Sequence, residues 1–295
     1  MNNSQINRPI GIFDSGIGGL TVARALRKLL PKETLCYFGD TARVPYGAKS
    51  PETVKRYSLE ITRFLISHNV KMIVVACNTV SSVSLPQIRE QFNGPVIGVV
   101  EPGVRAAISV SKSHRIGVIG TKSTIQSGAY QKRLLEKNKS LHIIAQACPL
   151  FVPLVEEGWE NDAITYDIAK RYLEPLVKDN LDAVILGCTH YPLIDHIIEN
   201  VMGDTVQLVN SAEEAAIEVE ETLKEHKLLS ETKLLKDLFY ASDDIEGFKR
   251  LYKRIFGDLH STFVEAPSDF FSIVQQVHRF KDKLHTDPIT WFEPY

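Results

Sequence analysis

Two cysteines lie in polar surroundings where a thiol could do chemistry. Cys77 is followed by Asn78 and Thr79, directly after an apolar run. Cys188 opens the segment Cys-Thr-His, so the imidazole of His190 lies two residues from the thiol. A thiol at a helix start has a lowered pKa, and a nearby imidazole can tune or relay its proton. We therefore expect two reactive thiols that exchange protons with a ligand.

Both thiols also have plainer interpretations. Free cysteine is among the most buried residue types, so Cys77 could simply pack in the core. The Cys-Thr-His segment could belong to a metal site, but further ligands are missing at any normal zinc spacing, so we expect no metal. It could also hold the nucleophile of a hydrolase, although a matching second cysteine argues against this. Cys36 and Cys148 lack polar neighbours and are predicted to be core residues.

Two thiols at matching positions suggest inversion of a carbon centre. That reaction needs a base on one face of the substrate and an acid on the other, with roles that exchange for the opposite hand. The α-hydrogen of an amino acid is very weakly acidic. The site must therefore stabilise a carbanion-like state by desolvation and by donors aimed at the carboxylate. The pattern therefore favours inversion at the α-carbon of such a substrate.

A glycine-rich loop follows the first predicted strand and runs from Asp14 to Gly19 as Asp-Ser-Gly-Ile-Gly-Gly. It fits neither the dinucleotide fingerprint nor a P-loop, because the glycine spacing differs and no Lys-Ser/Thr pair follows. Such a loop before a helix can bind a carboxylate, although a tight turn is the commoner reason for its glycines. Asp14 is either a functional carboxylate or a helix cap, and we weigh the two equally.

Alternating strands and helices must position these residues. Apolar runs bounded by turn residues predict two blocks of four strands, and each strand of the second block starts 106 to 111 residues after its counterpart. A cysteine and a threonine follow the third strand of both blocks, which indicates an internal duplication. The predicted strands are Ile10–Asp14, Leu35–Phe38, Met72–Ala76, Val96–Val100, Ile116–Ile119, His142–Ala147, Ala183–Leu186 and Val206–Val209.

The fold class expected is α/β, with two pseudo-symmetric parallel-sheet domains that face each other across a cleft. Ligands of such sheets gather at the carboxyl ends of the strands, where both thiols lie. A further strand at Leu235–Tyr240 and a helix at Ile245–Phe256 return to one unit. The first domain is therefore expected to be discontinuous, with residues 1–99 and 210–295, and the second to span 100–209.

Helix starts carry local signals. Ser50 is predicted to cap a helix that has Pro51 at its first position. Ser211 and Glu214 fit a capping box for the helix after the eighth strand. Near the end of the chain, a surface helix is expected at about Phe270–Lys283.

Bulk properties limit the class of protein. The 295 residues suit two domains, and a formal charge of -2 does not favour nucleic-acid binding. The most apolar run, Val70–Cys77, is too short to span a membrane, and Met1–Pro9 lacks the apolar core of a signal peptide. Four cysteines are too few for a disulfide framework, which favours the cytoplasm. The oligomeric state is left open, with a homodimer as one option.

Four segments resemble the signature segments of glutamate racemases, within the aspartate/glutamate racemase superfamily. They are Asp14–Gly19, Pro45–Gly47, Ala76–Thr79 and Gly187–Pro192. The resemblance covers about residues 8–257 and keeps the order of the motifs. It implies two α/β domains, independence of pyridoxal phosphate, and production of D-glutamate for peptidoglycan.

The resemblance also implies roles for particular residues. Cys77 and Cys188 are the implied acid/base pair, assisted by Asp14 on the Cys77 side and by His190 with Glu156 on the Cys188 side. Glu156 would not be selected from the sequence alone, because most glutamates are simply solvated. The residues implied to contact the amino acid are Asp14, Ser15, Tyr46, Gly47, Cys77, Asn78, Thr79, Thr121, Cys188 and Thr189.

Some features depart from the family pattern, and rival functions stay open. Val80 stands where the family commonly has alanine, and Tyr240–Asp243 stands where it often has Thr-Gly-Asp. An aspartate racemase would share the cysteine pair, whereas a decarboxylase of the superfamily is expected to manage with one. A non-catalytic amino-acid sensor on the same fold is the rival from another class.

Overall fold

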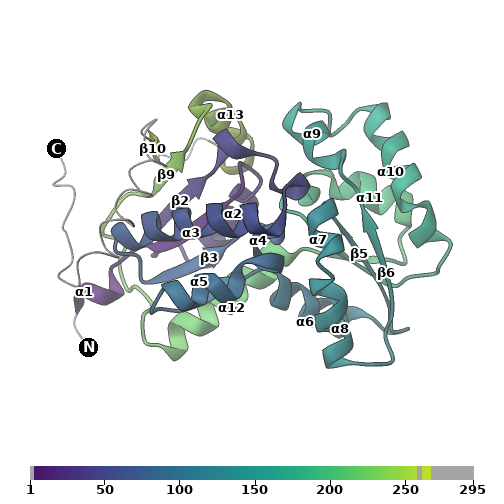
Figure 1. Ribbon diagram of the computed structural model, residues 1–295, viewed down its shortest axis with the longest axis horizontal. Coiled ribbons are helices and arrows are strands. Elements are labelled where there is room, and N and C mark those ends of the chain that lie inside the picture. Colours follow the sequence, from purple (N-terminus) through teal and green to yellow (C-terminus); the bar gives the residue numbers. More distant parts are fainter. Residues whose placement is uncertain (1–2, 258–260, 267–295) are drawn as a thin grey trace.

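The computed structural model describes residues 3–257 and 261–266, which form two α/β units side by side (Figure 1). All paired strands are parallel. The strands are β1 (Ile10–Asp14), β2 (Leu35–Gly39), β3 (Met72–Val75), β4 (Val96–Gly98), β5 (Arg115–Gly120), β6 (His142–Ala147), β7 (Ala183–Gly187), β8 (Gln207–Val209), β9 (Leu238–Ala241) and β10 (Thr262–Glu265).

The two sheets share one strand order. The larger sheet runs β10-β9-β2-β1-β3-β4 and the smaller runs β6-β5-β7-β8. In both, the first strand of the block lies between the second and the third. The predicted fold class of two related parallel-sheet units is therefore confirmed, and all eight strands of the predicted repeat are present.

Helices cover both sheets, and within the described residues none is long and apolar enough to cross a membrane. Three short 3-10 helices are η1 (Thr41–Arg43), η2 (Tyr46–Ala48) and η3 (Tyr191–Ile194). The α-helices are α1 (Asn3–Ile6), α2 (Leu20–Leu29), α3 (Pro51–Ser67), α4 (Asn78–Val83), α5 (Leu85–Gln91), α6 (Val100–Val110), α7 (Lys122–Gln126), α8 (Ala129–Lys137), α9 (Phe151–Glu156), α10 (Ala163–Val177), α11 (Asp195–Met202), α12 (Ser211–Glu225) and α13 (Ile245–Phe256).

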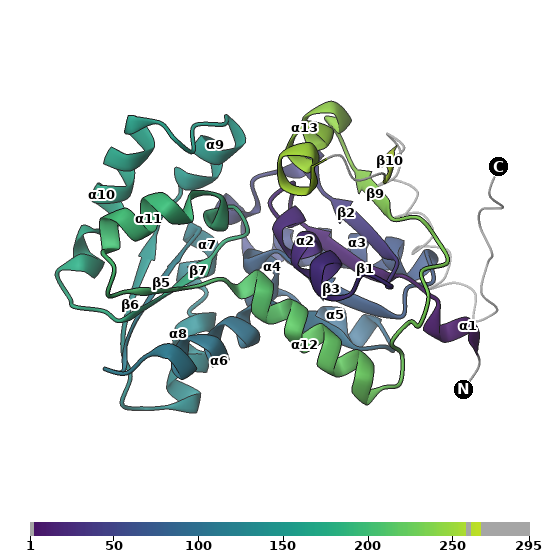
Figure 2. The same cartoon turned by 180° about the vertical axis from the view of Figure 1, so that it is seen from behind.

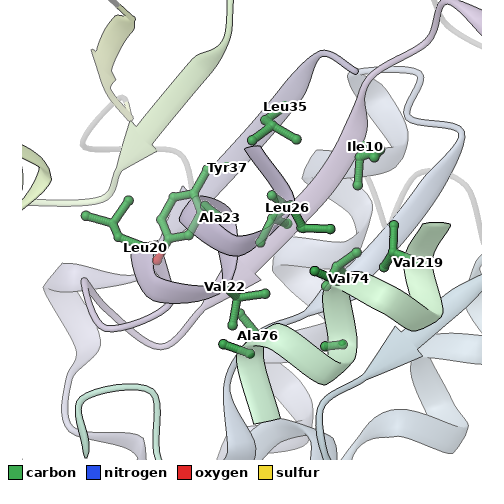
Figure 3. Packing of buried hydrophobic residues seen from close by; sticks show 14 of the residues in the cluster. Ile10, Leu20, Val22, Ala23, Leu26, Leu35, Tyr37, Val74, Ala76 and Val219 are labelled. Atoms are coloured by element: carbon green, nitrogen blue, oxygen red, sulfur yellow. The ribbon is translucent and has the colours of Figure 1, made fainter. Parts of the chain in front are cut away.

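The central strands of each sheet are buried on both faces, as expected for parallel strands with continuous apolar runs. Along β3, Met72 and Val74 enter one core cluster, while Ile73 and Val75 enter the cluster on the other face. Figure 3 shows the first of these clusters, where Leu20, Val22 and Leu26 of α2 pack over the sheet. The alternation fixes which way each strand faces. The side chains after each strand end are thereby positioned as well.

Helix α12 lies at the junction of the two units (Figure 2). It packs on α2 and β4 of one unit and on α6 and β7 of the other. The chain thus passes between the units at α6 and again between β8 and α12. The strands of the larger sheet come from residues 10–98 and 238–265, and those of the smaller sheet from 115–209. The domain boundaries at 99/100 and 209/210 stay a prediction.

The two remaining cysteines, Cys36 and Cys148, are core residues, as predicted. Both are fully buried in apolar clusters. Burial raises the pKa of the Cys36 thiol to about 12, and it raises the pKa of Cys148 further. Both side chains are therefore neutral thiols, which makes them useful references for the two candidate thiols.

Local helix signals were partly right. Ser50 caps α3 through its side chain, as predicted. The capping box at Ser211 is wrong, because α12 starts one residue earlier than expected and Asn210 is its N-cap, accepting from the backbone N–H of Ala212. The hydroxyl of Ser211 instead donates to the carbonyl of Leu186 over 3.4 Å.

The late elements also differ in part from the prediction. The strand predicted at Leu235–Tyr240 is found later in the chain, as β9 at Leu238–Ala241. The backbone N–H of Leu35 in β2 donates to the side chain of Asp237, so pairing between the backbones of β2 and β9 starts only at Leu238. Helix α13 has the predicted bounds. The helix expected near Phe270–Lys283 lies outside the described residues.

Candidate active site

The candidate residues lie at the carboxyl ends of the central strands of both sheets. Asp14 is the last residue of β1, and Cys77 follows β3 at the N-cap of α4. In the other unit, Thr121 directly follows β5 and Cys188 directly follows β7. Two equivalent strand ends of each sheet therefore carry the candidate groups.

Threonine side chains form hydrogen bonds between the strand-end loops of the two units. Thr79 Oγ1 lies 3.0 Å from Thr121 Oγ1 and 3.3 Å from Thr124 Oγ1. Thr21 donates through Oγ1 to the carbonyl oxygen of Thr189 over 3.1 Å. The loops of one unit thus hydrogen-bond directly to the loops of the other. Thr21 and Thr124 were not singled out from the sequence, since a threonine near a helix start has many ordinary uses.

Cys77 is held as a neutral thiol. Its Sγ donates to Ser15 Oγ over 3.4 Å, and the residue is 5% exposed. Burial, followed by the nearby Asp14 carboxylate, raises the pKa of Cys77 to about 12, although the backbone N–H of Val80 acts in the opposite direction. The prediction that the helix start lowers the pKa of this thiol is therefore wrong in net direction, because desolvation outweighs the helix.

Asp14 is fully buried beside this thiol. Its Oδ2 accepts from the backbone N–H of Gly16 over 3.0 Å, while Oδ1 accepts no hydrogen bond from the described residues. Burial raises the pKa of Asp14, and the charge of His190 together with loop N–H groups opposes this. Gly19 is the N-cap of α2 and no side chain caps that helix, so Asp14 is not its cap.

Cys188 lies beside a histidine, whereas Cys77 lies beside a carboxyl group. His190 Nδ1 lies 3.8 Å from Cys188 Sγ, and His190 Nε2 lies 3.0 Å from Glu156 Oε1. Burial alone would lower the pKa of His190, but its hydrogen bonds to Cys188 and Glu156 and their charges raise it to about 10. An imidazolium therefore stands beside Cys188, whereas the buried carboxyl group of Asp14 stands beside Cys77.

Asn78 and Tyr130 join the two units at a fully buried point. The phenol of Tyr130, on α8, donates to Asn78 Oδ1 over 2.6 Å. The Nδ2 of Asn78 is also buried and donates to no group among the described residues. Tyr130 was missed by sequence reasoning, because a tyrosine on an amphipathic helix is ordinarily a core residue.

The loop before α3 approaches the second unit at Gly47. A Cβ at this position would lie 2.6 Å from Cβ of Thr121, so the close approach requires glycine. The phenol of Tyr46 donates to Asp40 within its own unit, and Ser242 donates to the other carboxylate oxygen of Asp40. Of the two residues predicted here, Gly47 reaches across to the other unit, while the hydroxyl of Tyr46 holds the loop in place.

A cavity of about 460 Å³ opens beside these groups, between the two units. It is lined on one side by the loops after β1 and β2 and by α13, and on the other by the end of α9. Gly16 and Glu156 belong to its lining, while the two thiols are only 5% and 6% exposed and are not part of it. The described residues contain no group of three or more metal-ligating side chains.

The arrangement can carry out two-sided proton transfer. One thiol, Cys77, is kept neutral by burial, and the other, Cys188, lies 3.8 Å from His190, whose pKa is raised to about 10. Two buried polar atoms near Cys77 have no hydrogen-bond partner among the described residues. They are Oδ1 of Asp14, whose carboxyl group is close to the thiol, and Nδ2 of Asn78, the next residue in the chain. Most residues proposed from the sequence lie at these strand ends or in the first turn of the helix that follows, while Glu156 is the last residue of α9 and Tyr46 and Gly47 lie in η2.

Comparisons with known proteins agree on one family. Residues 20–219 match the Asp/Glu/Hydantoin racemase family. A glutamate racemase of Geobacter metallireducens is 47% identical over 267 residues, which cover 89% of this chain and 99% of that protein.

Solved structures agree. A glutamate racemase isoform of Bacillus anthracis is 40% identical, with a TM-score of 0.85, over 88% of this chain and 97% of that one. The glutamate racemase of Francisella tularensis, crystallised with D-glutamate, is 37% identical, with a TM-score of 0.83, over 88% and 98% of the two chains. This chain therefore belongs to the glutamate racemases of the Asp/Glu/Hydantoin racemase family.

Proposed function

We propose that this protein interconverts L- and D-glutamate by proton transfer between Cys77 and Cys188. In one direction, the thiolate of Cys188 takes the α-hydrogen of the substrate as a proton. The thiol of Cys77 then delivers its own proton to the opposite face of the α-carbon. Cys188 ends as a thiol and Cys77 as a thiolate, so the reverse reaction starts from the opposite hand of substrate.

The observation that carries this proposal is the difference between the neighbours of the two thiols. His190, paired with Glu156 at 3.0 Å, lies 3.8 Å from Cys188 Sγ, so a positive charge stands where the proposed base would carry its negative charge. Burial and Asp14 keep Cys77 protonated. These different surroundings support a base at Cys188 and an acid at Cys77. A hydrolase would need one activated thiol and would have no use for a second, protonated one.

Glutamate is the proposed substrate because relatives at 37–47% identity are named glutamate racemases, and one of them was crystallised with D-glutamate. The residues proposed to contact it are Asp14, Ser15, Tyr46, Gly47, Cys77, Asn78, Thr79, Thr121, Cys188 and Thr189. We further propose a cytoplasmic enzyme that supplies D-glutamate for peptidoglycan, with a homodimer as its assembly, and domain boundaries at 99/100 and 209/210.

The test is exchange of the α-hydrogen in deuterated water. Purified protein, reduced and without added cofactor, is incubated with L-glutamate or L-aspartate, followed by NMR for deuterium and by chiral chromatography for handedness. Deuterated D-glutamate is expected from L-glutamate, with little turnover of aspartate. Turnover of aspartate instead would keep the mechanism and change the substrate. Absence of exchange with either would reject racemisation in favour of an amino-acid sensor.

Single-thiol variants test the mechanism itself. Cys77→Ser and Cys188→Ser are each expected to lower racemisation by about 10³-fold or more, since either an acid or a base is lost. Cys36→Ala and Cys148→Ala are the matched controls, because these buried thiols lie in the core. They are expected to lose about 1–2 kcal/mol of stability and to keep normal activity. Normal racemisation by either serine variant would contradict the two-thiol mechanism.

A further inference from the structure

Tyr130 contacts the neighbours of both candidate thiols. Its ring packs against Gly187, the residue before Cys188. A Cβ added at Gly187 would lie 3.3 Å from Cε2 of Tyr130. Its hydroxyl reaches 2.6 Å from Oδ1 of Asn78, the residue after Cys77. The side chain is fully buried. One tyrosine of the second unit therefore spans from the Cys188 loop to the Cys77 loop.

The hydrogen bond decides which way the amide of Asn78 faces. The phenol of Tyr130 donates to Oδ1 of Asn78, and burial raises the pKa of the phenol, so it keeps its proton. With the oxygen held toward Tyr130, the Nδ2 group lies at the other edge of the planar amide. That group is buried and has no acceptor among the described residues. A buried donor without a partner is costly, so an anionic ligand beside Cys77 would relieve that cost.

We propose that Tyr130 is a positioning residue that fixes the Asn78 amide with its nitrogen toward the substrate, so that it donates to a substrate carboxylate. This inference rests on the proposed function and adds a residue to its machinery. Tyr130 and Asn78 belong to helices of different units, α8 and α4, so the bond that fixes the amide comes from the other half of the protein.

Tyr130→Phe removes the hydroxyl and keeps the ring. We expect KM for glutamate to rise about 10-fold with kcat changed little, because the amide would rotate freely and the carboxylate contact serves substrate and transition state alike. Tyr252→Phe is the matched control, since Tyr252 is also buried and its hydroxyl bonds Ser261, away from the thiols. That variant is expected to keep the wild-type KM.

A double-mutant cycle separates positioning from general structural damage. Asn78→Ala should raise KM at least as much as Tyr130→Phe, and adding Tyr130→Phe to it should change KM by less than twofold, because Tyr130 acts through Asn78. Asn78→Asp keeps the acceptor for Tyr130 but replaces the donor, so it should bind glutamate no better than Asn78→Ala. Thermal melting of each variant checks that it is folded.

The outcomes separate this inference from the function on which it rests. If the wild type and Tyr252→Phe exchange the α-hydrogen of glutamate while Tyr130→Phe keeps a normal KM, the positioning role is rejected and the function stands. Additive effects of Tyr130→Phe and Asn78→Ala would also reject it, as would normal binding by Asn78→Asp. If the wild type itself exchanges no hydrogen, the proposed function fails first.

Discussion

Gly18 and His190 lie so close together that a Cβ on residue 18 would be 2.4 Å from His190 Nδ1. It would also lie 2.5 Å from Thr189 Oγ1. Gly18 does not adopt a left-handed backbone conformation, so the reason for glycine here is the close approach of the two units. The glycine-rich loop after β1 thus forms the surface against which the imidazole beside Cys188 is packed.

Gly18→Ala is expected to displace the imidazole and to lower kcat/KM by about 10²-fold, since a misplacement of about 1 Å in a catalytic group can have this effect. Steady-state racemisation with L-glutamate measures it. Gly203→Ala is the control, because that glycine has a positive φ of 86° and nothing within 4 Å of the added Cβ. It should lose about 1 kcal/mol of stability and keep full activity. Equal activity of both variants would contradict the assigned contact.

Glu156→Gln is expected to lower the pKa of His190, because the neutral amide no longer supports the imidazolium. If protonated His190 is needed, activity falls as the pH rises through this pKa, so the alkaline limb of the rate profile moves to lower pH in the variant. The Glu156 side chain is 33% exposed, and water screens its charge, so a shift of about one pH unit is expected. Glu157→Gln, one residue along, should leave the profile in place.

The raised pKa of His190 also leads us to expect that the free energy of unfolding depends on pH. The pKa of His190 is raised from 6.5 to about 10 in the folded protein, so its contribution to stability is complete below pH 6.5 and is lost as the pH rises toward 10. Urea unfolding should therefore give a lower free energy of unfolding at pH 9 than at pH 6, and this decrease should be smaller for Glu156→Gln than for the wild type. A larger decrease in the variant would contradict this linkage to His190.

Asp14→Asn removes the charge that helps to hold Cys77 as a thiol. The pKa of Cys77 should fall, so alkylation of this thiol by iodoacetamide at pH 8 should become faster, by about 3- to 10-fold. Racemisation should fall by about 10-fold or more, since proton transfer at Cys77 is no longer tuned. Cys36, which is buried in the same unit, provides an internal reference whose alkylation rate should not change.

Lys71→Met tests a buried ion pair at the opposite end of β3 from Cys77. The Lys71 and Glu33 side chains are each 1% exposed and lie 2.6 Å apart. Removing the lysine leaves the carboxylate buried without its partner, so unfolding free energy should fall by about 3–5 kcal/mol. Lys178→Met, at an exposed pair with Glu174, should change it by about 0.5 kcal/mol or less. Activity per folded molecule should stay normal in both.

Strand ends and helix starts could be predicted because their signals are local. The apolar run before Cys77 and the repeat of that pattern before Cys188 placed both thiols after the third strand of a block, as the structure has them. Ser50 with Pro51 marked the start of α3 in the same way. These features depend on periodicity and on residues within a few positions, which the chain contains before it folds.

The protonation states and hydrogen-bond partners in the site were decided by tertiary structure. Tyr130 lies 52 residues from Asn78, and Thr21 lies 168 residues from Thr189, so no spacing in the sequence indicates either bond. The local helix start predicted a lowered pKa for Cys77, yet burial reversed it.

The sequence by itself therefore determined which groups end the strands, and the packing of the two units determined what each group faces and which charge it carries. Desolvation and hydrogen bonding depend on neighbours that come together only when the chain has folded.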